Sequence, residues 1–184
     1  MRTITVRELM VPLEAYATVS KEATLREAIL ALETAQMTID PSRHKHRAIL
    51  VLDDSGNVVS KITMKNILVA LEPNYGKLEG TDVLERSGYS PDLIRSMLED
   101  NALWAKPLQF VHERAIQLKV ADFIQTPSAG EYIEENASLG EAIHQLIAYP
   151  TLSLLVTSSD KVVGILRLSD VFTKICDIIK SDRC

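Results

Sequence analysis

The sequence predicts a mixed α/β (α+β) fold made of two copies of one β-α-β-β-α unit, related by pseudo-twofold symmetry, with a helical insertion between them. Three observations lead to this prediction. Residues recur at a fixed spacing, each copy holds an amphipathic helix followed by a hairpin pattern, and a central stretch matches neither copy. The expected boundaries are 1–71 for the first repeat, 72–117 for the insertion and 118–184 for the second repeat.

The repeat is clearest in the opening part of each copy. Identical or similar residues between Val6 and Ile29 recur between Val120 and Ile143, all at one offset (120 − 6 = 114). From Val58 onward the offset is shorter (162 − 58 = 104), because the first copy carries extra residues after its first helix. Two copies are too few for a solenoid, so they most simply form a pseudo-twofold pair with binding sites near the shared seam.

The first copy contains one capping signal for each of its two helices. Thr24 and Glu27 form a capping box, and Thr63 caps the second helix. Apolar residues at helical spacing predict the helices, and short apolar runs on both sides of a turn signal predict the two strands of a hairpin. The expected elements are a short start over 3–10, an extended segment over 19–23, a helix over 24–33, strands over 48–52 and 58–62, and a helix over 64–71.

The second copy repeats this order, and Ser138 with Glu141 repeats the capping box. Its expected elements are a strand over 132–133, a helix over 139–148, strands over 153–157 and 162–166 around a turn at 158–161, and a helix over 169–180.

The insertion carries a helix-start signal of its own. Ser90 is a good cap and Pro91 suits the first helical position, so a helix is expected to end near Asn101. Its apolar stripe must be covered. Two alternatives stay open: the insertion packs against its own module, or it forms a dimer or partner surface in which Trp104 is the residue of interest.

Composition excludes several classes of function. A net charge of −5 argues against a nucleic-acid surface, and few aromatic residues argue against base stacking. The sequence shows neither a signal peptide nor a membrane span. Cys176 and Cys184 do not have the spacing of metal ligands, and two scattered cysteines fit a reducing compartment, so we expect a cytoplasmic protein. His44 and His46 lack a third ligand, so no metal site is expected.

The sequence also lacks the common catalytic motifs. It has no phosphate loop, no dinucleotide-binding glycine motif, no HExxH, no paired CxxC and no GxSxG. Because the two repeats occupy most of the chain, we expect a binding module and not an enzyme.

Two long stretches resemble one known family. They are 48–66, Ala-Ile-Leu-Val-Leu-Asp-Asp-Ser-Gly-Asn-Val-Val followed by Lys-Ile-Thr-Met-Lys-Asn, and 161–170, Lys-Val-Val-Gly-Ile-Leu-Arg-Leu-Ser-Asp. With the openings at 6–10 and 120–124 they resemble CBS domains, and the tandem pair resembles a Bateman module. The resemblance implies a regulatory, energy-sensing protein with adenine-nucleotide sites where the two copies meet.

The family motif places Gly, two apolar residues, Thr or Ser, two free positions and Asp between the last strand and the last helix of a repeat. The second copy has Gly164 and Asp170 but carries Arg167 at the hydroxyl position. We expect Asp170 to hold the ribose and Arg167 to contact phosphate, with Ser169 beside them at the helix N-terminus. The alternatives are that Asp170 is only a helix cap and that Arg167 is a solvated strand end.

The first copy departs differently from the motif. Thr63 is in place, but Ser60 replaces Gly and Asn66 replaces Asp, so this site should bind ribose more weakly. Lys65 lies between the two motif residues. The basic loop 40–47 leads into the strand that begins at Ala48, so Arg47 and Ala48 should border this site. The alternative is that the loop is only a solvated connection between the helix and the strand.

The leading expectation is therefore a regulatory module that binds AMP, ADP or ATP, with no covalent cofactor, as a homodimer that signals to a protein partner. The alternative is a CBS-pair scaffold whose nucleotide sites have decayed and which acts through dimerisation or protein contacts.

Overall fold

The computed structural model describes residues 4–38, 45–72, 74–75, 90–100, 102–105 and 109–181. The first repeat contains β2 (Thr18–Ser20), α1 (Leu25–Thr38), β3 (Ala48–Leu52), β4 (Val58–Thr63) and α2 (Met64–Leu71). The second contains β5 (Tyr132–Glu134), α6 (Leu139–Ala148), β6 (Ser153–Ser158), β7 (Lys161–Arg167) and α7 (Leu168–Ser181). The β-α-β-β-α order is confirmed in both copies.

The two sheets have the same internal pairing. In the first repeat β2 pairs parallel with β3, and β3 pairs antiparallel with β4; β5, β6 and β7 do the same in the second. Each hairpin has one register shift, between Val51 and Leu52 in β3 and between Val156 and Thr157 in β6. Because even this irregularity recurs at equivalent positions, the pseudo-twofold relation extends to the backbone hydrogen bonds.

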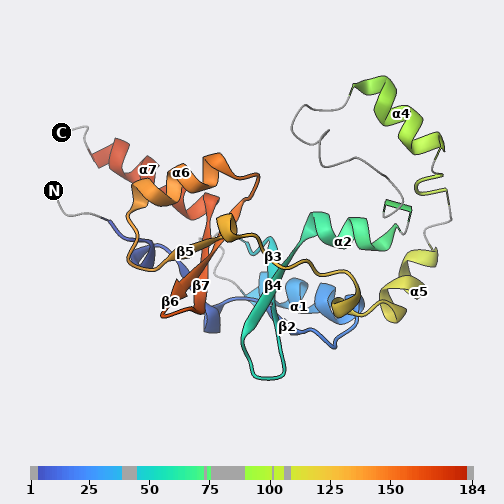
Figure 1. The fold of residues 1–184 in the computed structure, drawn as a ribbon, viewed down its shortest axis with the longest axis horizontal. Helices are drawn as coiled ribbons and strands as arrows, with labels where there is room; N and C mark the ends of the chain where they lie inside the picture. The colour runs from blue at the N-terminus through green and yellow to red at the C-terminus, as the bar shows by residue number, and fades with distance from the viewer. Residues whose placement is uncertain are drawn as a thin grey trace.

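The opening segment of each repeat packs against the other repeat. Val6 is buried in the core of the second repeat and its N–H donates to Ala137 O, whereas Val120 is buried in the core of the first and its N–H donates to Ala23 O. A two-residue strand, β1 (Val11–Pro12), joins the edge of β7 and makes the second sheet four-stranded. In Figure 1 the blue N-terminal segment accordingly lies beside α6 and α7.

The two repeats meet at a small apolar seam. Tyr16 and Leu50 of the first repeat pack with Leu155 and Ile165 of the second, and all four are buried. The sheets therefore face each other at the centre of the molecule, with the helices of each repeat on its outer side (Figure 1).

Two helices begin or end at other residues than the sequence predicts. α1 ends at Thr38, later than expected, and Ala35 continues its core-facing stripe. α7 begins at Leu168, so Asp170 is its third residue and the cap interpretation of Asp170 is wrong. Arg167 is not a solvated strand end either, since it is only 8% exposed.

The insertion has two described helices with different surroundings. α5 (Gln109–Gln117) packs on the first repeat through buried Ala115, and Arg114 Nε donates to Ala70 O at 2.7 Å. α4 (Pro91–Asp100) begins as expected, with Ser90 Oγ accepting from Leu93 N, but buries none of its residues. Residues 76–89, Asn101 and 106–108 lie outside the described residues.

Candidate functional site

A cleft of about 1690 Å³ opens at the seam and is walled by both repeats and by α4. The N-terminal ends of α2 and α7 both contribute to it, through 63–66 and 167–169. Helix N-termini present free backbone N–H groups and a positive dipole end, which favour an anion. The two copies therefore share one continuous cleft.

Nearly all the predicted site residues lie in this cleft. The residues of the first copy that line it are Thr63, Lys65, Asn66, Arg47 and Ala48, and those of the second are Arg167 and Ser169. Asp170 is the exception, because it is not part of the lining. Of the predicted basic loop 40–47, only 45–47 lie within the described residues, and Lys45 also lines the cleft.

Arg167 and Asp170 form a two-pronged ion pair. Arg167 Nε donates to Asp170 Oδ2 at 2.5 Å, and the guanidinium NH2 donates to Oδ1 at 2.6 Å. The side chains are 10% and 16% exposed. Residues three apart face each other on the first turn of a helix, so the sequence spacing contains the signal for this pair, although we did not predict it. Both carboxylate oxygens of Asp170 are engaged.

Thr63 and Asn66 occupy the equivalent positions in the first copy and form a neutral counterpart. Asn66 Oδ1 accepts from Thr63 N at 2.8 Å and from its hydroxyl at 2.5 Å, while Thr63 Oγ1 accepts from Asn66 N at 3.2 Å. This is a reciprocal capping box. In both copies the two motif side chains are thus hydrogen-bonded to each other.

The first motif position is explained by chain packing. A Cβ at Gly164 would lie 2.5 Å from Val11 O, since β1 pairs with β7 at this point and Pro12 lies opposite Gly164. In the first copy the buried Ser60 instead donates its hydroxyl to Gln125 O at 2.7 Å. Gln125 is equivalent to Val11 (125 − 114 = 11). In the first copy the backbone at Gln125 therefore lies far enough from residue 60 for a serine side chain to fit.

Tyr16 and His46 stack beside the Arg167–Asp170 pair, with ring centroids 4.0 Å apart. Burial raises the pKa of Tyr16 to about 12, although Arg167 acts against that rise. Burial, helped by the Arg167 cation, lowers the pKa of His46 to about 4. His46 Nδ1 accepts from Ala17 N, so a neutral imidazole fits its surroundings. Sequence reasoning assigned no role to either ring.

Lys61 is a further residue to which sequence reasoning assigned no role. Its side chain is 6% exposed and its ammonium group contacts three acceptors of the second repeat: Glu131 Oε2 at 2.9 Å, Ser153 O at 2.6 Å and Thr151 Oγ1 at 3.0 Å. Burial acts to raise the pKa of Glu131, but hydrogen bonds from Lys61 and Ser128 hold it below its ordinary value. The equivalent of Lys61 is Ile165, so a comparison of the two copies contained the signal (165 − 104 = 61).

The cleft is strongly basic for an acidic protein. Among the described residues that line it, one carboxylate, Glu131, accompanies six cationic side chains, Lys45, Arg47, Lys61, Lys65, Arg95 and Arg167. Arg95 comes from α4, whose exposed Ile94 and Leu98 also line the cleft. In a protein of net charge −5, this arrangement attracts an anionic ligand with an apolar part.

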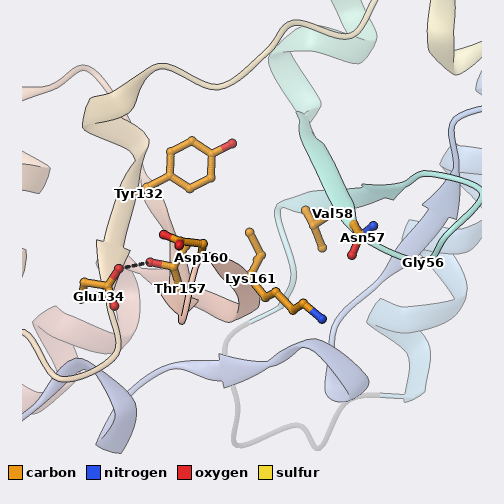
Figure 2. Close-up of a pocket in the computed structure, with 9 residues that line it drawn as sticks. Gly56, Asn57, Val58, Tyr132, Glu134, Thr157, Asp160 and Lys161 are labelled. Atoms are coloured by element: carbon orange, nitrogen blue, oxygen red, sulfur yellow. Dashed lines mark hydrogen bonds between the residues drawn. The ribbon is translucent and has the colours of Figure 1, made fainter.

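A smaller hollow of about 580 Å³ lies between the two hairpin turns (Figure 2). Its acidic side chains are Glu134 and Asp160, and Thr157 donates to Glu134 at 2.8 Å. Lys161 extends away from both carboxylates, toward Asn57 and Val58 (Figure 2). This hollow contains none of the motif residues and has no surplus of positive charge, so it does not match the expected site.

The described residues form neither a metal-binding cluster nor a membrane-spanning helix. In the described part of the chain, no three His, Cys, Asp or Glu side chains gather as a metal ion would require. His44 lies outside that part. Over the same residues, no helix has both the length and the apolar character needed to cross a bilayer.

Comparison with known proteins identifies the repeats. The family model described as CBS domain matches residues 6–73 and again 120–177. The chain belongs to the CBS domain family. The two matched CBS domains bracket the insertion and account for the duplicated architecture. A search of curated proteins found no match.

Solved CBS structures share the fold over most of the chain. A CBS domain-containing protein of unknown function from Bacillus anthracis is 19% identical, with a TM-score of 0.61 and coverage of 95% of this chain and 94% of that one. CBSX2 in complex with AMP is 17% identical (TM-score 0.58; 95% and 97% covered). The CBS domain of a bacterial CNNM/CorC family Mg²⁺ transporter in complex with ATP is also 17% identical (TM-score 0.57; 94% and 87% covered).

Proposed function

We propose that this CBS pair is a regulatory, non-catalytic module that binds an adenosine-containing nucleotide, AMP, ADP or ATP, in the cleft between its repeats and signals to a protein partner in the cytoplasm. One observation carries the proposal. A basic cleft in an acidic protein joins the N-termini of α2 and α7, and it is lined by Thr63 and Asn66 of the first motif and by Arg167 of the second. The structures of CBSX2 with AMP and of the CorC-type domain with ATP support the choice of ligand class.

The signal would be a change in geometry. The cleft takes residues from both repeats and from α4, so a ligand in it touches three parts of the chain. A ligand shifts a conformational equilibrium only by its difference in affinity for two arrangements. A nucleotide that contacts both repeats would favour one arrangement of the repeats relative to each other. α4 would move together with the repeats or cover the bound nucleotide.

Thermal unfolding against adenosine, AMP, ADP, ATP and GTP, with and without magnesium, tests the proposal. A ligand at a hundred times its Kd adds about 2.7 kcal/mol, and each kcal/mol shifts Tm by roughly 2–4 °C in a chain of this size. We expect a shift of several degrees with an adenine nucleotide, reduced by Arg47→Glu in the cleft and unchanged by the exposed Arg26→Glu outside it. No shift with any adenine ligand at millimolar concentration overturns the proposal.

A specific observation favours the second candidate, a scaffold with decayed sites. In both copies the motif side chains bond to each other, Arg167 with Asp170 and Thr63 with Asn66. A scaffold of this kind would show no nucleotide response and would act through its exposed surfaces.

A homodimer is part of both candidates, and one surface supports it. Met64 and Leu68 on α2 are 46% and 56% exposed, and their equivalents Leu168 and Phe172 on α7 are 40% and 67% exposed. Apolar residues one turn apart at equivalent positions on two helices form a self-complementary surface suited to a second copy.

A further inference from the structure

We infer that Tyr149 stacks on the purine base of the ligand in the first-repeat half of the cleft and so directs the phosphate toward the N-terminus of α2. This inference rests on the proposed nucleotide function and adds the orientation in which the ligand lies. Tyr149 is the residue directly after α6, and neither family motif includes it.

The ring of Tyr149 is held in place before any ligand binds. It lies against Gly130, which is buried, and a Cβ at Gly130 would overlap the ring. Gln145, one turn earlier on α6, donates from Nε2 to Gly130 O at 2.8 Å and to Tyr132 O at 2.7 Å. A ring that is already fixed loses little conformational entropy when a base stacks on it.

The rest of the Tyr149 ring is open to the cleft. Tyr149 is 45% exposed and lines the cleft, although part of the ring covers a buried glycine. Pro150 and Leu152, which follow it in the chain, line the cleft as well. An aromatic ring with apolar neighbours is a suitable surface for a flat, neutral base.

The second-repeat half offers no such surface at the equivalent position. Tyr16 is the counterpart of Gly130 (130 − 114 = 16). Its ring is 6% exposed and is already stacked on His46, with the ring centroids 4.0 Å apart. Of these two tyrosines, only Tyr149 has ring surface left for a base, so we place the base in the first-repeat half.

The contacts of Lys61 place Tyr149 beside the first-repeat motif. The Lys61 ammonium group contacts Glu131, the residue after the buried glycine, and Thr151, two residues after Tyr149. Lys61 and Thr63 lie on the same face of β4, because alternate residues of a strand share a face. The tyrosine ring and the first motif therefore belong to the same part of the cleft.

Basic side chains lie next to Thr63 and suit the phosphate. Lys65 is the second residue of α2, and Arg47 precedes Ala48, which pairs with Thr63; both basic residues line the cleft. The helix N-terminus adds free N–H groups. A nucleotide with its base on Tyr149 and its phosphate at this end matches each part of the ligand to a surface of suitable chemistry.

Isothermal titration with AMP, ATP and ribose 5-phosphate tests the inference. Tyr149→Leu keeps an apolar side chain over Gly130 but removes the aromatic ring. We expect this variant to bind AMP or ATP about fivefold or more weakly than the wild type, and Tyr149→Phe to bind like the wild type. Ribose 5-phosphate has no base, so it should bind the wild type and Tyr149→Leu equally. An equal loss for ribose 5-phosphate would give the ring a structural role and overturn the inference.

Proton NMR of the bound nucleotide gives a readout that a structural role would not move. The H2 and H8 protons of adenine should shift upfield on binding to the wild type and to Tyr149→Phe, because they lie over an aromatic ring. The shift should be lost in Tyr149→Leu, and a full shift in that variant overturns the inference. Phe110→Leu on α5 is the matched control: Phe110 is 43% exposed and does not line the cleft, so affinity and shifts should stay unchanged.

The two proposals fail in different ways. If the wild type binds AMP or ATP and Tyr149→Leu binds it as tightly, the inference alone fails. If the wild type binds neither nucleotide, the proposed function fails with it.

Discussion

The ammonium group of Lys61 lies 2.9 Å from the carboxylate of Glu131, and this ion pair joins the two repeats across the seam. The pair has no equivalent in the other half of the pseudo-twofold arrangement, where Ile165 and Ala17 hold the matching positions. One side of the seam is therefore ionic and the other apolar.

Lys61→Ile should destabilise the protein by about 2–3 kcal/mol, because it leaves Glu131 partly buried without its cation. The Glu131 side chain is still 25% exposed, so the loss of stability should be smaller than for a fully buried ion pair. Urea unfolding measures it. Adding Glu131→Gln should recover most of the loss, since Gln keeps the cap to Ser128 without the charge. A double variant as unstable as the single one would contradict this.

Gly164→Ala should cost about 2 kcal/mol, because its Cβ would lie 2.5 Å from Val11 O and force β1 away from β7. Hydrogen exchange should then show reduced protection of Val6 and Met10, which pack in the second core beside β1. Ser60→Ala is the matched control: it should cost about 1 kcal/mol for its lost hydrogen bond and leave that protection unchanged. Equal protection in both variants would refute the close-approach argument.

His46 should make stability fall between pH 6.5 and 5. Its pKa is near 6.5 in the unfolded chain and about 4 in the fold, so over this range the unfolded state binds more protons. Stability is then greatest above pH 6.5 and decreases as pH falls, by up to about 2 kcal/mol at pH 5, since one pKa unit is about 1.4 kcal/mol. In His46→Gln the unfolding midpoint should depend less on pH across this range. If the midpoint of that variant depends on pH as strongly as that of the wild type, the pH dependence comes from another group.

Glu72→Ala should release α4 from the first repeat. The buried Glu72 carboxylate accepts from Trp104 N at 2.7 Å and from Asn74 N at 2.9 Å, which ties the segment after α4 to the end of α2. Because Trp104 is the single tryptophan, its quenching by acrylamide reports on this contact directly. Quenching should rise in Glu72→Ala and not in the exposed Glu99→Ala. Identical quenching would show that the contact does not hold the insertion.

Phe172→Glu should yield monomers if the α2–α7 surface forms the proposed dimer, since a charge would lie in an apolar interface. Light scattering after size exclusion measures the mass. Ile147→Glu on α6 changes an even more exposed residue, at 79%, and should leave the dimer intact. A wild-type protein that is monomeric at high concentration would exclude this interface.

The element order was predictable because each repeat carries its own apolar periodicity and its own helix-capping residues. Each element predicted in one repeat also had a counterpart in the other. β1 was not predictable, because two residues ending in Pro12 show no alternation and gain their partner only from β7. Of the candidate site residues, Thr63, Asn66 and Arg167 line one cleft, whereas their role in binding a ligand stays a prediction. Which groups bond to one another there, above all Arg167 with Asp170, depends on side-chain geometry that motif matching ignores.

The exchange of opening segments has a consequence for synthesis on the ribosome. Val11 finds its strand partner at Ile165, so the segment around Val11 must wait until residue 165 has been translated. The first repeat likewise lacks Val120 in its core until translation has passed the insertion. Neither repeat can complete its core from its own residues alone, so folding should finish in one late step in which the opening segments of both repeats take part.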